Sequence, residues 1–119
     1  MSKHKFETIF HSDLGVAYYC ASNGELHIGF ASFLLIFYPT NFNSFVRNLE
    51  EQLRRRIRDE DPVNRKNIII PTPIREVSLL LSLEELVEFV GFLREIRSKV
   101  TQKELAKNVL RGKNGISLN

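Results

Sequence analysis

The pattern of apolar and polar positions along the chain repeats one arrangement twice. A pair of short apolar stretches precedes Thr40 and another precedes Ser82, and each pair is followed by apolar residues at helical spacing. A shift of 44 residues superimposes the apolar positions of the two helical segments, whereas the candidate caps Thr40 and Ser82 are 42 residues apart. The pattern predicts two ββα-like units and leaves open whether they arose by duplication or by shared packing requirements.

The strongest local signal is a predicted β-hairpin centred on Asn23-Gly24. An Asn-Gly pair favours a two-residue turn of type I′, which would pair Val16–Ala21 with Leu26–Phe30. With that register, Cys20 would lie directly opposite His27 on the more polar face of the hairpin. A turn-forming run before Val16 predicts a further strand ahead of the hairpin.

The rest of the first unit is a strand followed by a helix. The segment Phe33–Tyr38 is apolar on both faces, which predicts a central strand or one covered by a helix and a partner. Pro39 and Thr40 end this strand, and Thr40 is the candidate N-cap of the helix. The helix has one apolar stripe, which consists of Phe42, Phe45, Val46, Leu49, Leu53 and Ile57.

The second unit has the clearer helix start. Strands are predicted at Ile68–Ile70 and Ile74–Leu81, with a kink or a sheet edge between them at Pro71-Thr72-Pro73. Ser82 and Glu85 form a capping-box pattern that begins a helix running to Val100. Thr101 is a candidate cap for a further short helix over Gln102–Leu110.

These elements predict one α+β domain over residues 1–112, with an antiparallel sheet, two long helices on one face of it, and a frayed tail over residues 113–119. The 43% hydrophobic and 26% charged residues are typical of soluble globular proteins. No apolar run approaches the roughly 18 residues needed to cross a bilayer, and charges at the start of the chain disfavour a signal peptide. The single cysteine excludes a disulfide scaffold, so we predict a cytoplasmic protein with no membrane partner.

Aromatic composition suggests a protein interface. The chain has nine phenylalanines and no tryptophan, more large apolar side chains than one small core readily accommodates. We predict that the surplus forms the interface of a homodimer or of a complex with another protein, through Phe33, Leu35, Phe37 and Phe92. The alternative is that these residues build the core of the monomer.

Basic residues suggest a second kind of partner. From Arg94 onward the chain has seven Lys or Arg residues and two Glu. Such a segment could contact RNA phosphates through Arg94, Arg97, Lys103, Lys107 and Arg111. The arginines at positions 54–58 are flanked by acidic residues, which favours a solvated helix end for that run.

Cysteine and histidine give the remaining chemical candidate. Cys20 beside His27, with His11 on the neighbouring strand, could bind a transition metal or activate the thiol. The alternative is a half-buried cysteine packed against a histidine. A structural zinc site needs four ligands and a nucleophile needs an orienting group, and the sequence identifies neither, so no cofactor is predicted.

The order of several motifs resembles a small uncharacterised family of cytosolic proteins from Bacteroidota-type bacteria. The resemblance rests on Leu14-Gly15-Val16, Cys20, the apolar strand with its phenylalanine-rich helix, Ile68–Thr72 and the run Leu81–Leu86. Members of that family often have a second cysteine three positions after the first, where this chain has Asn23. The resemblance implies a cytosolic location and no particular activity.

Because no catalytic motif is present, we predict a non-enzymatic cytoplasmic protein-interaction module that self-associates. An RNA- or ribosome-associated protein that uses the basic C-terminal segment is the first alternative. A metal-binding or thiol protein that uses Cys20 and His27 is the second.

Overall fold

The computed structural model describes residues 6–113, with side chains described as far as Lys103. Six strands and two helices follow one another along the chain: β1 (Phe6–Ser12), β2 (Gly15–Cys20), β3 (Glu25–Phe30), β4 (Phe33–Phe37), α1 (Pro39–Arg58), β5 (Ile68–Pro71), β6 (Ser78–Leu81) and α2 (Leu83–Lys113). The predicted tail over residues 113–119 lies outside the described residues, apart from Lys113.

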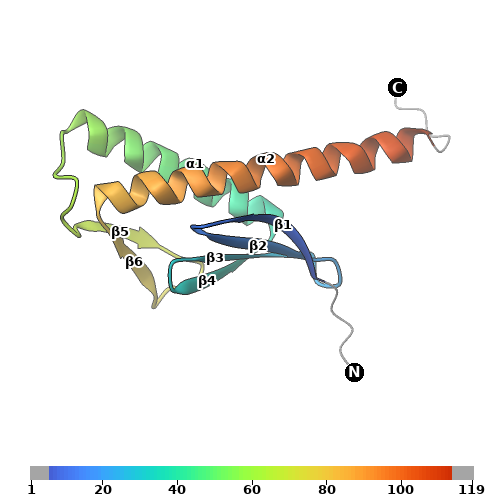
Figure 1. Ribbon diagram of the computed structural model, residues 1–119, viewed down its shortest axis with the longest axis horizontal. Coiled ribbons are helices and arrows are strands. Elements are labelled where there is room, and N and C mark those ends of the chain that lie inside the picture. Colours follow the sequence, from blue (N-terminus) through green and yellow to red (C-terminus); the bar gives the residue numbers. More distant parts are fainter. Residues whose placement is uncertain (1–5, 114–119) are drawn as a thin grey trace.

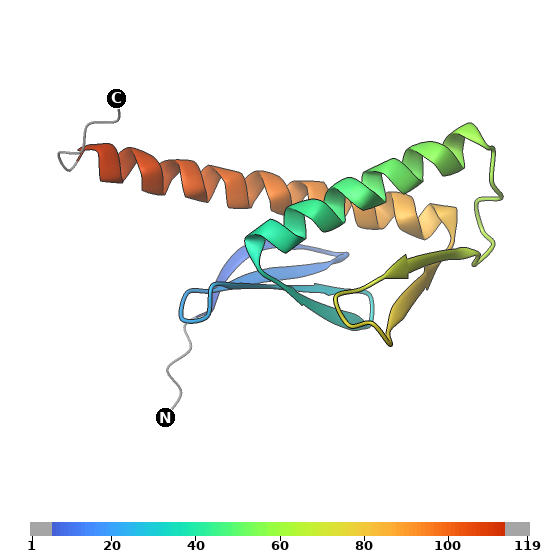
Figure 2. The same cartoon turned by 180° about the vertical axis from the view of Figure 1, so that it is seen from behind.

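The strands form two antiparallel sheets beneath the helices. Strands β1 to β4 form a four-stranded meander, and β5 pairs with β6 in a separate hairpin. Both helices lie on the same side of these strands (Figures 1 and 2). The α+β prediction is confirmed, and β3-β4-α1 and β5-β6-α2 are the two ββα units. The strands form two sheets where one was predicted: β5 and β6 pair with each other and not with β1 to β4. Pro71, which has no backbone N–H, ends β5 after four residues, as expected of a strand at a sheet edge.

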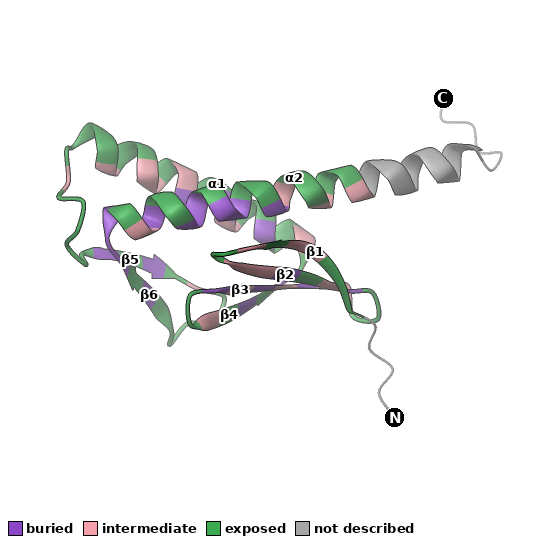
Figure 3. Ribbon diagram, viewed as in Figure 1, coloured by how far each residue is buried: buried purple, intermediate pink, exposed green. Residues whose placement is uncertain are grey.

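The core lies between the helices and the inner faces of the strands. Buried residues alternate with partly buried ones along β3 and with more exposed ones along β4, β5 and β6, as expected for strands covered on one face. Figure 3 shows the buried residues concentrated where the helices cover the strands. Phe89 of α2 is fully buried and its ring centroid lies 4.7 Å from that of Phe30 and 6.2 Å from that of Phe45. This aromatic cluster therefore joins the two units into one core.

The predicted register of the β2–β3 hairpin was wrong by two residues. Cys20 pairs with Glu25 and Tyr18 pairs with His27, so four residues form the turn. The Gly24 N–H donates to the Cys20 carbonyl at 2.8 Å, and Gly24 has a φ of 69° whereas Asn23 does not have positive φ. A type I′ turn needs positive φ at both central residues, which explains why the Asn-Gly pair does not set the register.

Gly15 marks a close approach between β2 and β3. A Cβ atom at this position would lie 2.0 Å from the carbonyl oxygen of Gly29 and 3.1 Å from the Cα atom of Phe30. Both neighbouring groups are backbone atoms in a paired strand, so they cannot move aside as a flexible side chain would. Glycine is therefore required here for space, although its φ is ordinary.

The two helices begin differently. Helix α1 begins at Pro39 and its N-cap is Tyr38, which makes no side-chain capping bond, so the prediction of Thr40 as cap was wrong. Proline suits the first helical position because its φ is preset and its missing N–H would have no partner there. In α2 the predicted capping box is confirmed: the Glu85 N–H donates to Ser82 Oγ at 3.1 Å and the Ser82 N–H donates to Glu85 Oε1 at 2.9 Å.

Helix α2 continues through Thr101 to Lys113, so the predicted break into two helices was wrong. Threonine inside a helix costs only a few tenths of a kcal/mol, and Val100 to Leu110 contains no Pro or Gly to end the helix.

The predicted strand Ile74–Leu81 is shorter and begins at Ser78. Thr72 Oγ1 donates to the carbonyls of Ile74 and Val77, at 3.0 and 2.7 Å, and these bonds hold the preceding residues in a turn.

Candidate functional site

The face of the four-stranded sheet that points away from the helices carries four exposed large side chains. They are Phe6 of β1, Tyr18 of β2, and Leu34 and Ile36 of β4, with exposed fractions of 53, 37, 56 and 45%. The strand registers place all four on the same face, because residues that pair across two strands point to the same side of the sheet. Phe6 pairs with Cys20, and Tyr18 pairs with His27. On the other side of β3, Leu34 pairs with Gly29 and Ile36 pairs with His27. We call these four residues the outer apolar patch.

Side chains within the patch pack against one another around a shallow hollow. Phe6, Tyr18, His27 and Leu34 line a pocket of about 260 Å³. The ring of Phe6 lies edge-on to His27 at 5.3 Å and to Tyr18 at 6.2 Å between ring centroids. These contacts hold the aromatic side chains in place without burying them.

The outer face is almost free of charge. Among the described positions of β1 to β4 that point away from the helices, Glu25 is the single carboxylate and there is no Lys or Arg. The carboxylate of Glu25 lies 3.1 Å from His27 Nε2. Glu7 faces the helices instead and receives a 2.6 Å hydrogen bond from Lys103 Nζ of α2. The outer apolar patch therefore consists of large exposed side chains, none of which is charged.

The smaller sheet repeats this arrangement. Ile69 of β5 and Leu80 of β6 are paired and both are more than half exposed, while their neighbours Ile68, Ile70 and Leu81 are buried. Exposed apolar residues thus occur on the outer faces of both sheets.

Three of the four residues predicted as an interface lie inside the core. Leu35, Phe37 and Phe92 are buried, and Phe33 is partly buried against the same cluster. Strand β4 was predicted to be central or covered on both faces, but it is an edge strand whose inner residues Leu35 and Phe37 face the helices. The exposed residues are their neighbours Leu34 and Ile36, which alternation along the strand would have identified once the covered face was known.

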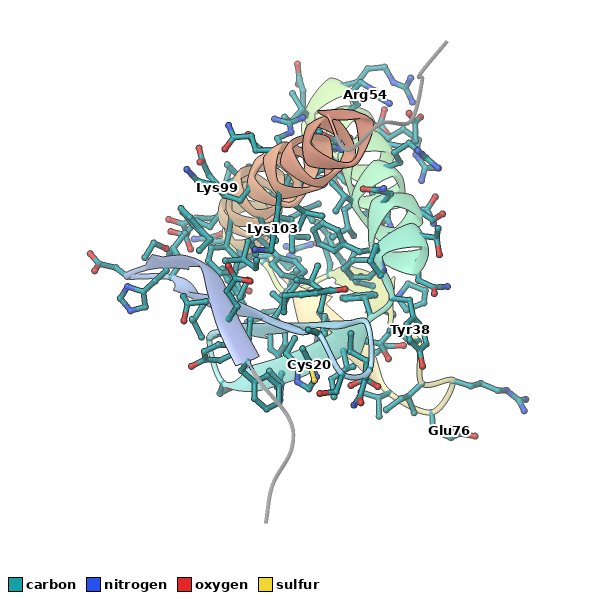
Figure 4. All side chains as sticks on the ribbon, turned by 90° about the vertical axis from the view of Figure 1, so that its right-hand side faces the viewer. Cys20, Tyr38, Arg54, Glu76, Lys99 and Lys103 are labelled. Atoms are coloured by element: carbon teal, nitrogen blue, oxygen red, sulfur yellow. The ribbon has the colours of Figure 1, made fainter. Side chains whose placement is uncertain are left out.

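The predicted metal ligands are not brought together. Cys20 is buried on the side of the sheet away from the helices (Figure 4), where it pairs with Glu25 and Phe6. His27 is two residue pairs further along, opposite Tyr18, and His11 lies near the far end of β1 opposite Val16. Within the described part of the chain, no three histidine, cysteine or carboxylate side chains are grouped so that they could hold a metal ion.

Most of the basic residues predicted to bind nucleic acid have acidic partners within the domain. Arg94 and Arg97 of α2 both bind Glu50 of α1, at 2.7 and 2.9 Å, and Lys103 binds Glu7. The hydrogen bond from Arg97, followed by that from Arg94, lowers the pKa of Glu50 to about 2. The side chains of Lys107 and Arg111 lie outside the described residues. The described members of the series are thus engaged in holding α2 against α1 and β1.

Three arginines of the run at the end of α1 also pair with carboxylates. Arg54 pairs with Glu51, Arg56 with Asp61 at 3.0 Å, and Arg58 with Asp59 at 3.5 Å. These short-range pairs agree with the interpretation of the run as a solvated helix end.

The fold and this surface define a small two-layer α+β domain with an exposed, nearly uncharged sheet face. No described helix is both long enough and apolar enough to cross a membrane. A family model matches residues 1–112, and the chain belongs to that family, which is a family of unknown function (DUF6686). Comparison with curated proteins and with solved structures gives no match.

Proposed function

We propose that this chain is a non-enzymatic interaction module of the bacterial cytoplasm that associates with a second copy of itself through the outer apolar patch. The observation that carries the proposal is the exposure of Phe6, Leu34 and Ile36 on one face of the sheet, where Glu25 is the single carboxylate among the described strand residues. An apolar surface of this kind gains free energy when it is removed from water, at about 25 cal/mol per Å². The absence of a catalytic motif and the presence of one cysteine in the sequence support the non-enzymatic role and the cytoplasmic location.

The low charge of the face favours a second copy as the partner. In a two-fold symmetric dimer each patch meets the same patch, so any net charge would oppose a like charge. The outer face limits this conflict to one carboxylate among its described residues, that of Glu25, whose side chain is 24% exposed and lies 3.1 Å from His27 Nε2. The two sheets could then pack face to face at a separation of about 10 Å, as in sandwich proteins.

The size of the face predicts a dimer of moderate strength. Four strands spaced about 4.8 Å apart and about 20 Å long present roughly 400 Å² per subunit, and the β5–β6 hairpin adds roughly 100 Å². Both subunits together would bury about 1,000 Å², which is at the lower limit for a specific interface. We therefore expect a dissociation constant on the order of micromolar rather than nanomolar.

Sedimentation velocity over a range of concentrations tests the proposal. The wild-type chain should shift from monomer to dimer as its concentration rises through the micromolar range. The variant Leu34→Glu/Ile36→Glu should remain monomeric, since it places carboxylates against one another across the two-fold axis, while both positions are exposed and tolerate the change in the monomer.

The control is Ser98→Glu, which adds a carboxylate at an exposed position of α2. This helix belongs to the layer opposite the sheets, so the new charge lies outside the outer apolar patch. This variant should dimerise like the wild type. A wild-type chain that stays monomeric at 100 µM, or a patch variant that dimerises as well as the control, would count against the proposal.

A further inference from the structure

A second apolar surface lies at the other end of the domain, where α1 ends and α2 begins. Residues of α1, of the connection to β5 and of α2 line a groove of about 740 Å³. Leu83 is buried at its base, and Ile57, Val63 and Val87 are exposed along it by 56, 61 and 48%. Figure 1 shows this region at the left-hand end, away from the four-stranded sheet.

The rim of the groove is acidic. Glu60, Asp61, Glu84 and Glu88 line it, together with Asn64, and no Lys or Arg does. Asp61 is paired with Arg56, but none of the described side chains forms an ion pair with Glu60, Glu84 or Glu88. Glu84 is stabilised by the N-terminal dipole of α2, whereas Glu60 and Glu88 lie outside the first turn of that helix. The groove thus has apolar walls and three carboxylates that form no ion pair with any described side chain.

The connection that carries half of the rim is held in place. The Glu84 N–H donates to the Val63 carbonyl at 2.9 Å, and Asp61 bonds Arg56 through both its backbone N–H and its side chain. These bonds attach the connection to both helices. The groove is therefore formed before any partner arrives, which lowers the entropic cost of binding.

Glu60 occupies a backbone conformation that favours glycine. Its φ is 58°, and its N–H donates to the Ile57 carbonyl while that of Asp61 donates to Arg56, both at 3.1 Å. This is the Schellman arrangement at the end of a helix, in which the residue at the position of Glu60 is most often glycine. A glutamate at this position carries a conformational cost that a glycine would avoid, and strain of this kind is concentrated at functional sites.

We propose that the groove binds a basic amphipathic helical segment of another protein. Apolar side chains spaced i, i+3 and i+4 on such a helix would contact Ile57, Val63 and Val87, and flanking Lys or Arg residues would pair with Glu60, Glu84 and Glu88. The groove and the outer apolar patch share no residue, so this proposal does not depend on self-association.

Fluorescence anisotropy tests the groove directly with the full chain. The probe is a fluorescein-labelled synthetic peptide of about 18 residues, with leucines at i, i+3, i+4 and i+7 and lysines at most other positions. The variant Glu60→Gln/Glu84→Gln/Glu88→Gln should bind it at least about tenfold more weakly, with a smaller salt dependence. Val87→Lys should weaken binding to a similar degree, since it replaces an apolar contact with a repelling charge.

The control protein is Glu76→Gln/Glu95→Gln, which removes exposed carboxylates outside the groove and should bind like the wild type. A control peptide with serines in place of the leucines retains its charge and should lose most of its affinity. Equal binding of both peptides, or equal loss in the groove and control variants, would reduce the interaction to general electrostatic attraction and overturn the proposal.

Glu60→Gly separates binding from stability. Glycine relieves the cost of positive φ, so this variant should melt roughly 2–5 °C higher than the wild type while it binds the probe peptide more weakly. A more stable variant with unchanged affinity would show that Glu60 has no part in recognition.

Sedimentation of the triple glutamine variant tests whether the groove binds another protein or a second copy of this chain. Its self-association should match that of the wild type, because the outer apolar patch is intact. If the groove variant loses self-association, the groove holds a second copy of this chain, and the proposal of a different protein is overturned.

Discussion

The two ββα units of this domain share their apolar pattern and differ in almost every polar feature. In the first unit, β3 and β4 are extended by β1 and β2 into a broad sheet, and α1 begins without a side-chain cap. In the second unit, β5 and β6 remain a short hairpin, and α2 begins with the Ser82 capping box. The apolar residues that both units share build the core, whereas the differences in strand number and in polar residues determine which surfaces are exposed.

The contact between the helices shows why the difference matters. Glu50 and Arg94 are 44 residues apart, so they occupy equivalent positions in the two units. They lie against each other at 2.7 Å, and Arg97 joins the same carboxylate. Identical residues at these positions would place like charges in contact. Opposite charges allow two similar helices to pack side by side, so the difference between the two units at these sites stabilises the joined domain.

The largest expected effect concerns the hairpin that enlarges the first unit. Gly15→Ala should destabilise the domain by about 3 kcal/mol, because the new methyl group would lie 2.0 Å from the Gly29 carbonyl oxygen. Gly29→Ala is the matched control in the adjacent strand, where the nearest atom is 3.7 Å away, and it should change stability by less than about 1 kcal/mol. Urea unfolding measures both. Equal effects of the two substitutions would contradict the close approach.

An intermediate effect is expected at the junction between the units. Glu50→Gln should destabilise the domain by about 1–2 kcal/mol at pH 7, where the carboxylate is bound by two arginines. Because the pKa of Glu50 falls from 4.5 to about 2 on folding, its contribution is complete above pH 5 and declines as the pH falls toward 2.

Thermal melts at pH 7 and pH 3 should therefore show a difference between wild type and Glu50→Gln that shrinks at the lower pH. Glu95→Gln, on an exposed position of α2, provides the control and should show little difference at either pH. A constant difference for Glu50→Gln would mean that its effect comes from packing rather than from charge.

The smallest expected effect compares the two helix starts. Ser82→Ala should cost about 1 kcal/mol because it removes the acceptor for the Glu85 N–H. Thr40→Ala should cost almost nothing, since Thr40 is exposed within the first turn of α1 and Pro39 precedes it. Chemical denaturation of the two variants in parallel distinguishes a capped helix start from an uncapped one. A larger loss for Thr40→Ala would reverse the assignment.

Features set by local chemistry could be predicted from the sequence. The capping box depends on Ser82 and Glu85 alone, and both helical stripes follow from spacing along one segment, except that Ile57 of the first stripe is exposed. The register at Gly24 and the start of α1 at Pro39 could not be predicted in the same way, because several turns are compatible with the same residues.

Surfaces were the hardest features to predict because they depend on topology. An apolar strand such as β4 has the same sequence pattern whether it is central or at an edge of a sheet. The sequence therefore predicted Leu35 and Phe37 as interface residues, whereas the exposed pair is Leu34 and Ile36. The groove went unpredicted because Ile57, Val63 and Val87 come from three separate segments. Glu60 offers no signal in the sequence, since its unusual conformation appears only in the structure.

Methyl NMR on a mixed sample tests the central claim most directly. Half of the chains carry ¹³C-labelled Leu and Ile methyl groups and half are unlabelled, so isotope-filtered NOEs report only contacts between two copies. The proposed dimer predicts intermolecular NOEs from Leu34 and Ile36 to aromatic protons of Phe6 and Tyr18. Intermolecular NOEs from Ile57 instead, or none at concentrations where the chain sediments as a dimer, would contradict association through the outer apolar patch.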